Sequence, residues 1–168
     1  MKLNIYSWLI WALFPLALVG GTYSHAVGTT ERESATNAAA IKQIHHDSRA
    51  SALVAFMEQH NFAPDQYQYV NQIIKDADSN KIPAALLVCI DLQESSGGKR
   101  YYRSTSNPFG WGSDQISFAS ERIAIDYISR QLGSGRYYAG KSIEGKLHAY
   151  NPNPEYSIKI INCINQIK

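Results

Sequence analysis

Glu94 is the side chain whose position in the sequence suggests chemistry most clearly. Residues 83–94 predict a helix that is apolar almost all round, and such a helix is buried. Glu94 shares a face with Leu87 and Ile90 and comes just before Gly97-Gly98, which end the helix. Desolvation and the negative end of the helix dipole both raise the pKa of a carboxyl placed there. We therefore expect Glu94 to act as a general acid, the alternative being an exposed glutamate at a fraying helix end.

A turn-rich loop with an amide and two aromatic side chains follows this helix, with the sequence Ser106-Asn107-Pro108-Phe109-Gly110-Trp111-Gly112-Ser113. Asn107 can satisfy buried backbone groups. Trp111 offers a flat surface on which a sugar ring can stack, although both aromatic residues could instead fill the core.

The chain contains 11 tyrosines in 168 residues, which is a high number. Aromatic residues with polar tips suit carbohydrate surfaces, although several of these tyrosines must belong to the core. In the C-terminal part of the chain the tyrosines selected as candidates are Tyr138, Tyr150 and Tyr156.

The helix with Glu94, the loop that follows it and the C-terminal tyrosines occur in an order that resembles the bacterial glucosaminidase family (mannosyl-glycoprotein endo-β-N-acetylglucosaminidase-like) of the lysozyme-like superfamily. The resemblance extends from about Tyr67 to Ile167 and rests on an ordered series: Gln93-Glu94-Ser95-Ser96-Gly97 within residues 86–98, then residues 106–110, then Ser117-Phe118 with Tyr127, and finally Tyr150 with Pro154-Glu155-Tyr156. It implies a mainly α, lysozyme-like domain that cleaves the glycan strands of peptidoglycan. The family's catalytic glutamate would be Glu94, its Asn-x-Phe-Gly element would be Asn107, Phe109 and Gly110, and the tyrosine of its C-terminal motif would be Tyr150.

One departure from the family's pattern concerns the second carboxylate. Many members carry a β-hairpin lobe that supplies it, but the segment between Gly112 and Phe118 is too short for such a lobe. Glycoside hydrolysis usually uses two carboxyl groups. The acids near this gap are Asp114 and Glu121, and we choose Asp114 as the second catalytic group.

A second departure is Asp91, at a position where the family usually has an apolar or small residue. If Asp91 faces Glu94, repulsion between the two carboxylates raises one of their pKa values. If it points outward, we expect it to pair with a base such as Lys99 or Arg100.

The predicted function is therefore that of an exported peptidoglycan hydrolase that cleaves the β-1,4 glycan strand, with Glu94 as general acid. Asp114, Tyr150 or the substrate's own acetamido group would assist, and the predicted substrate contacts are Asn107, Phe109, Trp111, Tyr138 and Tyr156. Two alternatives are a lytic transglycosylase that uses one glutamate and a non-catalytic module for cell-wall binding or assembly. We expect a monomer without cofactor or metal.

The rest of the sequence predicts the helices that must position these residues. One ends near residues 60–61, a second begins at Pro64-Asp65 and ends at Ser79, and others cover residues 84–94, 142–150 and 155–167. A further helix is capped by Ser120 or Ser117, and its inward residues are Ile123, Ala124, Tyr127, Ile128 and Leu132. Because no segment alternates with period two, the predicted fold is mainly α with little or no β-lobe.

Length and composition allow one globular domain, since 45% of the residues are hydrophobic and 18% are charged. A formal charge of +2 gives too weak an electrostatic field to attract a nucleic acid, so we expect no nucleic-acid partner. Residues 1–26 predict a signal peptide, with an apolar run over residues 5–19 and small residues at Ser24 and Ala26. An uncleaved N-terminal membrane anchor is the alternative. The apolar run would also allow transient membrane association through the N-terminus. Residues 27–47 predict a flexible linker and residues 48–168 the domain, which we expect in the periplasm or secreted.

Two cysteines remain, Cys89 in the buried helix and Cys163 in the last helix. Because export exposes a protein to oxidising conditions, we expect a disulfide between them. Two buried free thiols that pack as small hydrophobic groups are the alternative.

Overall fold

The computed structural model describes residues 48–113 and 115–167, and over these residues the protein is mainly α, as predicted. The predicted signal peptide and linker, together with Asp114, lie outside the described residues. No strand occurs within the described ranges, and none of their helices is long and apolar enough to cross a membrane. The elements are α2 (Ser48–Gln59), η1 (Pro64–Tyr69), α3 (Val70–Ser79), α4 (Ala84–Ser95), η2 (Arg103–Thr105), α5 (Glu121–Ser134), α6 (Ile143–Tyr150) and α7 (Pro154–Ile164), where η marks a 3₁₀ helix.

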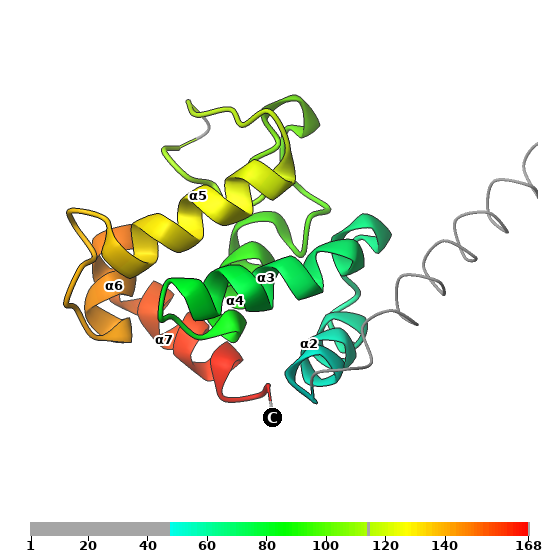
Figure 1. Cartoon of the computed structure of the whole chain (residues 1–168), viewed down its shortest axis with the longest axis horizontal. Coiled ribbons are helices and arrows are strands. Elements are labelled where there is room, and N and C mark those ends of the chain that lie inside the picture. Colours follow the sequence, from blue (N-terminus) through cyan, green and yellow to red (C-terminus); the bar gives the residue numbers. More distant parts are fainter. Residues whose placement is uncertain (1–47, 114, 168) are drawn as a thin grey trace, which may run out of the picture.

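Helices α3 and α4 form the middle of the domain. Helix α3 packs against α2, α4 and α5, whereas α4 packs against α3 and α7, and α6 packs against α7. Figure 1 shows α5 on one side of this central pair and α7 on the other, with α6 and α2 at opposite ends. A long irregular segment between α4 and α5, which contains η2, passes over the end of α4 where Glu94 lies.

Helix α4 is buried because it carries an unbroken apolar run. Leu86, Leu87 and Ile90 have no exposed side-chain surface, and Val88 and Cys89 are only 1% exposed. The helix ends at Ser96, which adopts a left-handed conformation (φ 56°) and donates its backbone N–H to the carbonyl of Asp91. The buried core thus fixes the helix, and the left-handed turn redirects the chain two residues after Glu94.

Some predicted helix boundaries and faces need correction. The segment from Pro64 begins as a 3₁₀ helix, and α7 ends at Ile164 and not at Ile167. The cap of α5 is Ser120, whose hydroxyl accepts the Ile123 N–H at 3.4 Å. The prediction that Ile123 faces inward is wrong, because its side chain is 49% exposed. It precedes Ile128 by five residues, which places it about 140° around the helix from the buried face.

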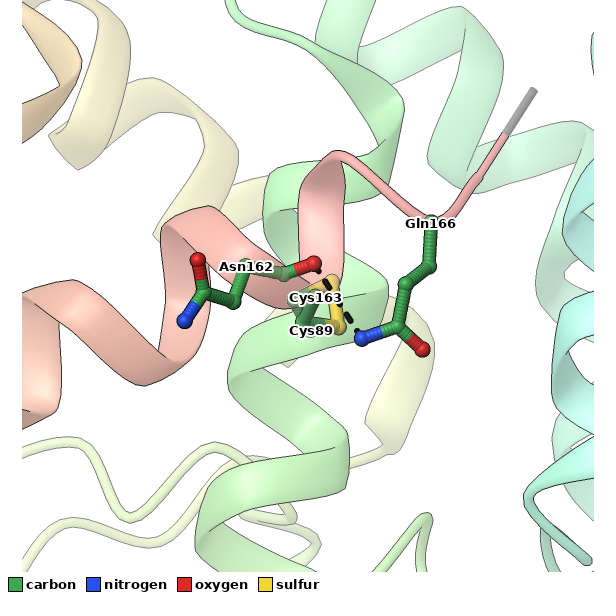
Figure 2. Close-up of a disulfide and its surroundings, with 4 residues drawn as sticks. All are labelled: Cys89, Asn162, Cys163 and Gln166. Atoms are coloured by element: carbon green, nitrogen blue, oxygen red, sulfur yellow. Dashed lines mark hydrogen bonds between the residues drawn. A yellow bond between two sulfur atoms is a disulfide. The ribbon is translucent and has the colours of Figure 1, made fainter.

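The structure joins Cys89 of α4 to Cys163 of α7 in a disulfide, the pairing that the sequence favoured. The two Cα atoms lie 5.9 Å apart, and 74 residues separate the cysteines along the chain. Figure 2 shows the sulfur atoms where α7 crosses α4, close to the point where Gln166 Nε2 donates to the Asn162 carbonyl at 3.2 Å. The C-terminal helix is therefore covalently attached to the helix that carries Glu94.

Candidate active site

A cleft of about 560 Å³ lies at the C-terminal end of α4. Its walls come from the end of that helix, from the irregular segment that follows, and from the end of α6. The residues that line it are Glu94, Arg100, Tyr101, Tyr102, Asn107, Pro108, Gly110, Ser113, Tyr150 and Asn151. Glu94 is the one acidic side chain among the described residues that line this cleft.

The Glu94 carboxylate is half-buried and lies directly against the backbone of the loop at Gly110. A Cβ atom added to Gly110 would lie 2.7 Å from Glu94 Oε2, which is closer than real Cβ contacts allow. Gly110 also has a φ of +60°, a conformation that residues with side chains rarely adopt. Glycine at this position therefore lets the loop close onto the carboxylate. The predicted rise in the pKa of Glu94 stays a prediction.

Tyr150 was predicted to assist catalysis, and it does line the cleft beside Glu94. Its hydroxyl, however, donates a hydrogen bond to the carbonyl of Phe109 in the loop. Burial above all, and then the nearby Glu94 carboxylate, raise the pKa of Tyr150 well above its usual value. A phenol that stays protonated and is already bonded to the backbone is a poor base or nucleophile. The arrangement makes Tyr150 a positioning residue that holds the loop in place.

Asn107 also holds the loop, which confirms the prediction that it satisfies buried backbone groups and corrects its predicted role in binding substrate. Its Nδ2 donates to the carbonyls of Trp111 and Ile116 at 2.8 and 3.0 Å, and its Oδ1 accepts the Trp111 N–H at 3.1 Å. The residue is only 1% exposed, so these three hydrogen bonds satisfy the amide with loop backbone. Although Asn107 contributes to the cleft wall, its polar atoms serve the loop.

Three of the predicted substrate contacts belong to the core behind the cleft. Phe109, Tyr138 and Tyr156 are 2%, 7% and 5% exposed, too little for any of them to present a surface to a sugar. Trp111 is half-buried and is not among the lining residues. Its ring lies edge-on to those of Tyr127 and Tyr150, at centroid distances of 5.9 and 5.5 Å. These aromatic residues support the wall of the cleft. The expectation that several tyrosines belong to the core is confirmed, but the sequence did not indicate which ones.

Tyr156 packs against Tyr150 behind the cleft. Its ring stacks on that of Tyr150, with 5.9 Å between centroids and 8° between planes. Burial raises the pKa of Tyr156, and the neighbouring Tyr150 and Glu94 raise it further. Both tyrosines therefore stay neutral next to the Glu94 carboxylate.

Asp91 behaves differently from both expectations. It is 5% exposed, and Ser95, four residues later in α4, donates its hydroxyl to an Asp91 carboxylate oxygen. Burial raises the pKa of Asp91 to about 7, while the Ser95 hydrogen bond acts in the opposite direction. The charged groups nearby are Glu121 and Asp65, so the predicted pairing with Lys99 or Arg100 is wrong. Asp91 is not among the residues that line the cleft.

Glu121, the other acid near the gap, lies beneath the wall of the cleft. It accepts hydrogen bonds from the hydroxyl of Tyr101 and from Gln66 Nε2, the latter at 2.8 Å. Arg103 Nη1 lies 3.5 Å from Glu121 Oε1 and 2.6 Å from Asp65 Oδ2, and Arg103 Nη2 donates to the Gly98 carbonyl at 2.9 Å. Glu121 is 9% exposed and is absent from the lining residues. It holds Tyr101 at the wall and does not supply a second acid to the cleft.

Sequence reasoning missed several lining residues, above all the consecutive Arg100, Tyr101 and Tyr102. They come after Gly97-Gly98, with Lys99 between, and both glycines have positive φ values, of 69° and 75°. The Arg100 N–H then donates to the Ser95 carbonyl at 2.7 Å, which keeps this stretch beside the last turn of α4. The glycine pair was the available signal, because a tight reversal after a helix brings the next residues back to its end.

The described residues contain no group of three or more His, Cys, Asp or Glu side chains that could hold a metal ion. In comparisons with known proteins, no family model matches the chain, and neither a curated protein nor a solved structure is similar to it at a significant level.

Proposed function

We propose that this protein cleaves the β-1,4 glycan strand of peptidoglycan, in the manner of an endo-β-N-acetylglucosaminidase, with Glu94 as the general acid. The observation that carries the proposal is the placement of Glu94 as the one acidic side chain among the described residues of the cleft. Tyrosines, a backbone loop and amides line the cleft around it, and such groups suit a sugar chain. The family resemblance of the sequence is the second support.

In the proposed reaction the Glu94 carboxyl donates its proton to the glycosidic oxygen as the bond from C1 to that oxygen breaks. The leaving sugar departs with a free hydroxyl, and positive charge develops on C1 and the ring oxygen of the other sugar. Water then adds to C1 and returns a proton to Glu94. Gly110 and Tyr150 contribute by fixing the loop that faces the carboxylate.

Glu94→Gln is the variant that tests this proposal. Glutamine keeps the size of the side chain but cannot donate the proton, so we expect the release of soluble fragments from purified peptidoglycan to fall by at least about 100-fold. Glu58→Gln is the matched control, because Glu58 is an exposed acid on α2. Equal activity of wild type and Glu94→Gln, or no activity in either, would contradict the proposal. In the second case, binding to peptidoglycan by both proteins would favour a non-catalytic wall-binding module.

One observation favours a lytic transglycosylase as the second candidate. The described residues supply the cleft with a single carboxyl group, whereas hydrolysis usually uses two. A transglycosylase manages with one, because the 6-hydroxyl of the muramyl sugar attacks C1 in place of water and returns its proton to Glu94. Mass spectrometry of the released fragments separates the two candidates. A transglycosylase product is lighter than the hydrolysis product by one water molecule and contains an anhydro sugar.

A further inference from the structure

Arg100 is the one cationic side chain among the described residues that line the cleft. It is exposed, and its backbone is held at the end of α4 by the 2.7 Å hydrogen bond from its N–H to the Ser95 carbonyl. The backbone of Arg100 is therefore held at the end of the helix that carries Glu94, while its side chain is exposed at the cleft.

The other cations of this segment differ from Arg100 in ways that matter. Arg103 is engaged with Asp65 at 2.6 Å and with the Gly98 carbonyl at 2.9 Å. Lys99 is exposed and is not among the lining residues. Arg100 alone of these three lines the cleft, and the described residues show no ion pair to its guanidinium group.

We propose that Arg100 binds a carboxylate of the substrate and thereby makes the cleft selective for muramyl-containing glycans over uncharged ones. This inference rests on the proposed function and deepens it. A guanidinium group matches a carboxylate with two parallel hydrogen bonds, which neutral sugars cannot provide. Because Glu94 repels an anionic ligand whenever it is ionised, a cation in the same cleft offsets that repulsion. The neighbouring Tyr102, which is 70% exposed, offers its ring to the sugar that carries the carboxylate.

Muramyl glycans contain carboxylates from two sources. One is the lactyl group of the muramyl sugar, which is free when no peptide is attached. The other is the stem peptide. When it is attached, its amide bond removes the lactyl carboxylate, but the peptide brings carboxylates of its own. Three substrates therefore define the test: strands without peptides, strands with peptides, and chitin oligosaccharides, which lack carboxylates.

The kinetic experiment compares full-length wild type, Arg100→Gln and Lys99→Gln on these three substrates. We expect Arg100→Gln to raise KM about tenfold on at least one muramyl substrate, with little change in kcat, and to change KM by less than about twofold on chitin oligosaccharides. Lys99→Gln, which removes a neighbouring charge outside the cleft, should leave all three substrates unaffected. A rise confined to peptide-free strands assigns the lactyl carboxylate, and one confined to intact strands assigns the peptide.

A binding experiment separates failure of this inference from failure of the proposed function. Dissociation constants of Glu94→Gln and Glu94→Gln/Arg100→Gln are measured by calorimetry for the peptide-free and intact muramyl strands and for chitin oligosaccharides. A tenfold loss confined to the muramyl ligands supports Arg100 as a carboxylate site even if the wild type cleaves nothing. Equal losses on charged and uncharged ligands, or no loss on any, would overturn the inference whether or not the wild type is an enzyme. Unchanged circular dichroism spectra of the variants confirm that they are folded.

Discussion

The disulfide between Cys89 and Cys163 makes a quantitative prediction about stability. It closes a loop whose ends are 74 residues apart in sequence, and a cross-link of that length lowers the entropy of the unfolded chain. The chain-entropy relation gives a stabilisation of about 4.4 kcal/mol at 25 °C for such a loop. Because native domains are stable by only about 5–15 kcal/mol, this bond accounts for a large part of the total.

The perturbation is the double variant Cys89→Ala/Cys163→Ala, compared with oxidised and reduced wild type. We expect the double variant and the reduced wild type to lose about 4 kcal/mol of unfolding free energy, measured by urea denaturation. At about 4 °C per kcal/mol for a domain of this size, the melting temperature should fall by about 15 °C. Dithiothreitol should have no effect on the double variant, which serves as the control for effects of the reductant on other parts of the protein.

The expected effect on activity is different from the effect on stability. The wall of the cleft depends on hydrogen bonds of Asn107, Tyr150 and Glu121, and none of these involves a cysteine. Cleavage per folded molecule should therefore change by less than about twofold below the melting transition. A loss of stability under about 1 kcal/mol would refute the reasoning, because it would mean that the unfolded chain is not restrained by the bond as the entropy relation requires.

Two further predictions concern Gly110 in the cleft and the buried carboxyl group of Asp91. Gly110→Ala should lower kcat at least about tenfold, since its methyl group would lie 2.7 Å from Glu94 Oε2. Gly140→Ala is the control, because Gly140 has a similar φ of +71° but open space around it, and this variant should only lose about 1 kcal/mol of stability. If both variants lose activity equally, the contact with Glu94 is not the cause. In the native state the pKa of Asp91 is raised from 3.8 to about 7, so the folded protein favours the protonated carboxyl. The stability that this protonated carboxyl contributes is therefore fully present below pH 4 and is lost as the pH rises through 7. Asparagine cannot ionise, so the unfolding free energy of Asp91→Asn minus that of wild type should grow by on the order of a few kcal/mol as the pH rises from about 4 to about 8. A difference that does not change with pH would contradict this.

The helices could be predicted because their signals are local. The apolar run of α4, the serine caps before α5 and α6, and the proline that opens α7 each follow from residues within a few positions. The error at Ile123 is also local in origin. It is an apolar residue in the first turn of α5, but the helical period places it opposite the buried face.

The cleft could be predicted only in part, because its walls come from a segment without periodicity. The sequence pointed to Glu94, Asn107 and Tyr150, and all three line the cleft. The sequence indicated that Asn107 can satisfy buried backbone groups, but it did not identify those groups. It also did not indicate that the Tyr150 hydroxyl is bonded to the loop, since that partner is fixed by the folded loop. The burial of Phe109 likewise depends on how that loop packs on the core.

Two independent constraints meet at Glu94, and together they explain why a loop with so little regular structure can form a defined cleft. From one side, α4 is fixed by its buried apolar residues. From the other side, the loop is held by the three hydrogen bonds of Asn107 and by the Tyr150 hydroxyl on the Phe109 carbonyl. The backbone at Gly110 therefore lies close to the Glu94 carboxylate, with no side chain between them. A carboxyl group in this position has little room to move on the side of the loop, and such restriction favours the proton donation that we propose for Glu94.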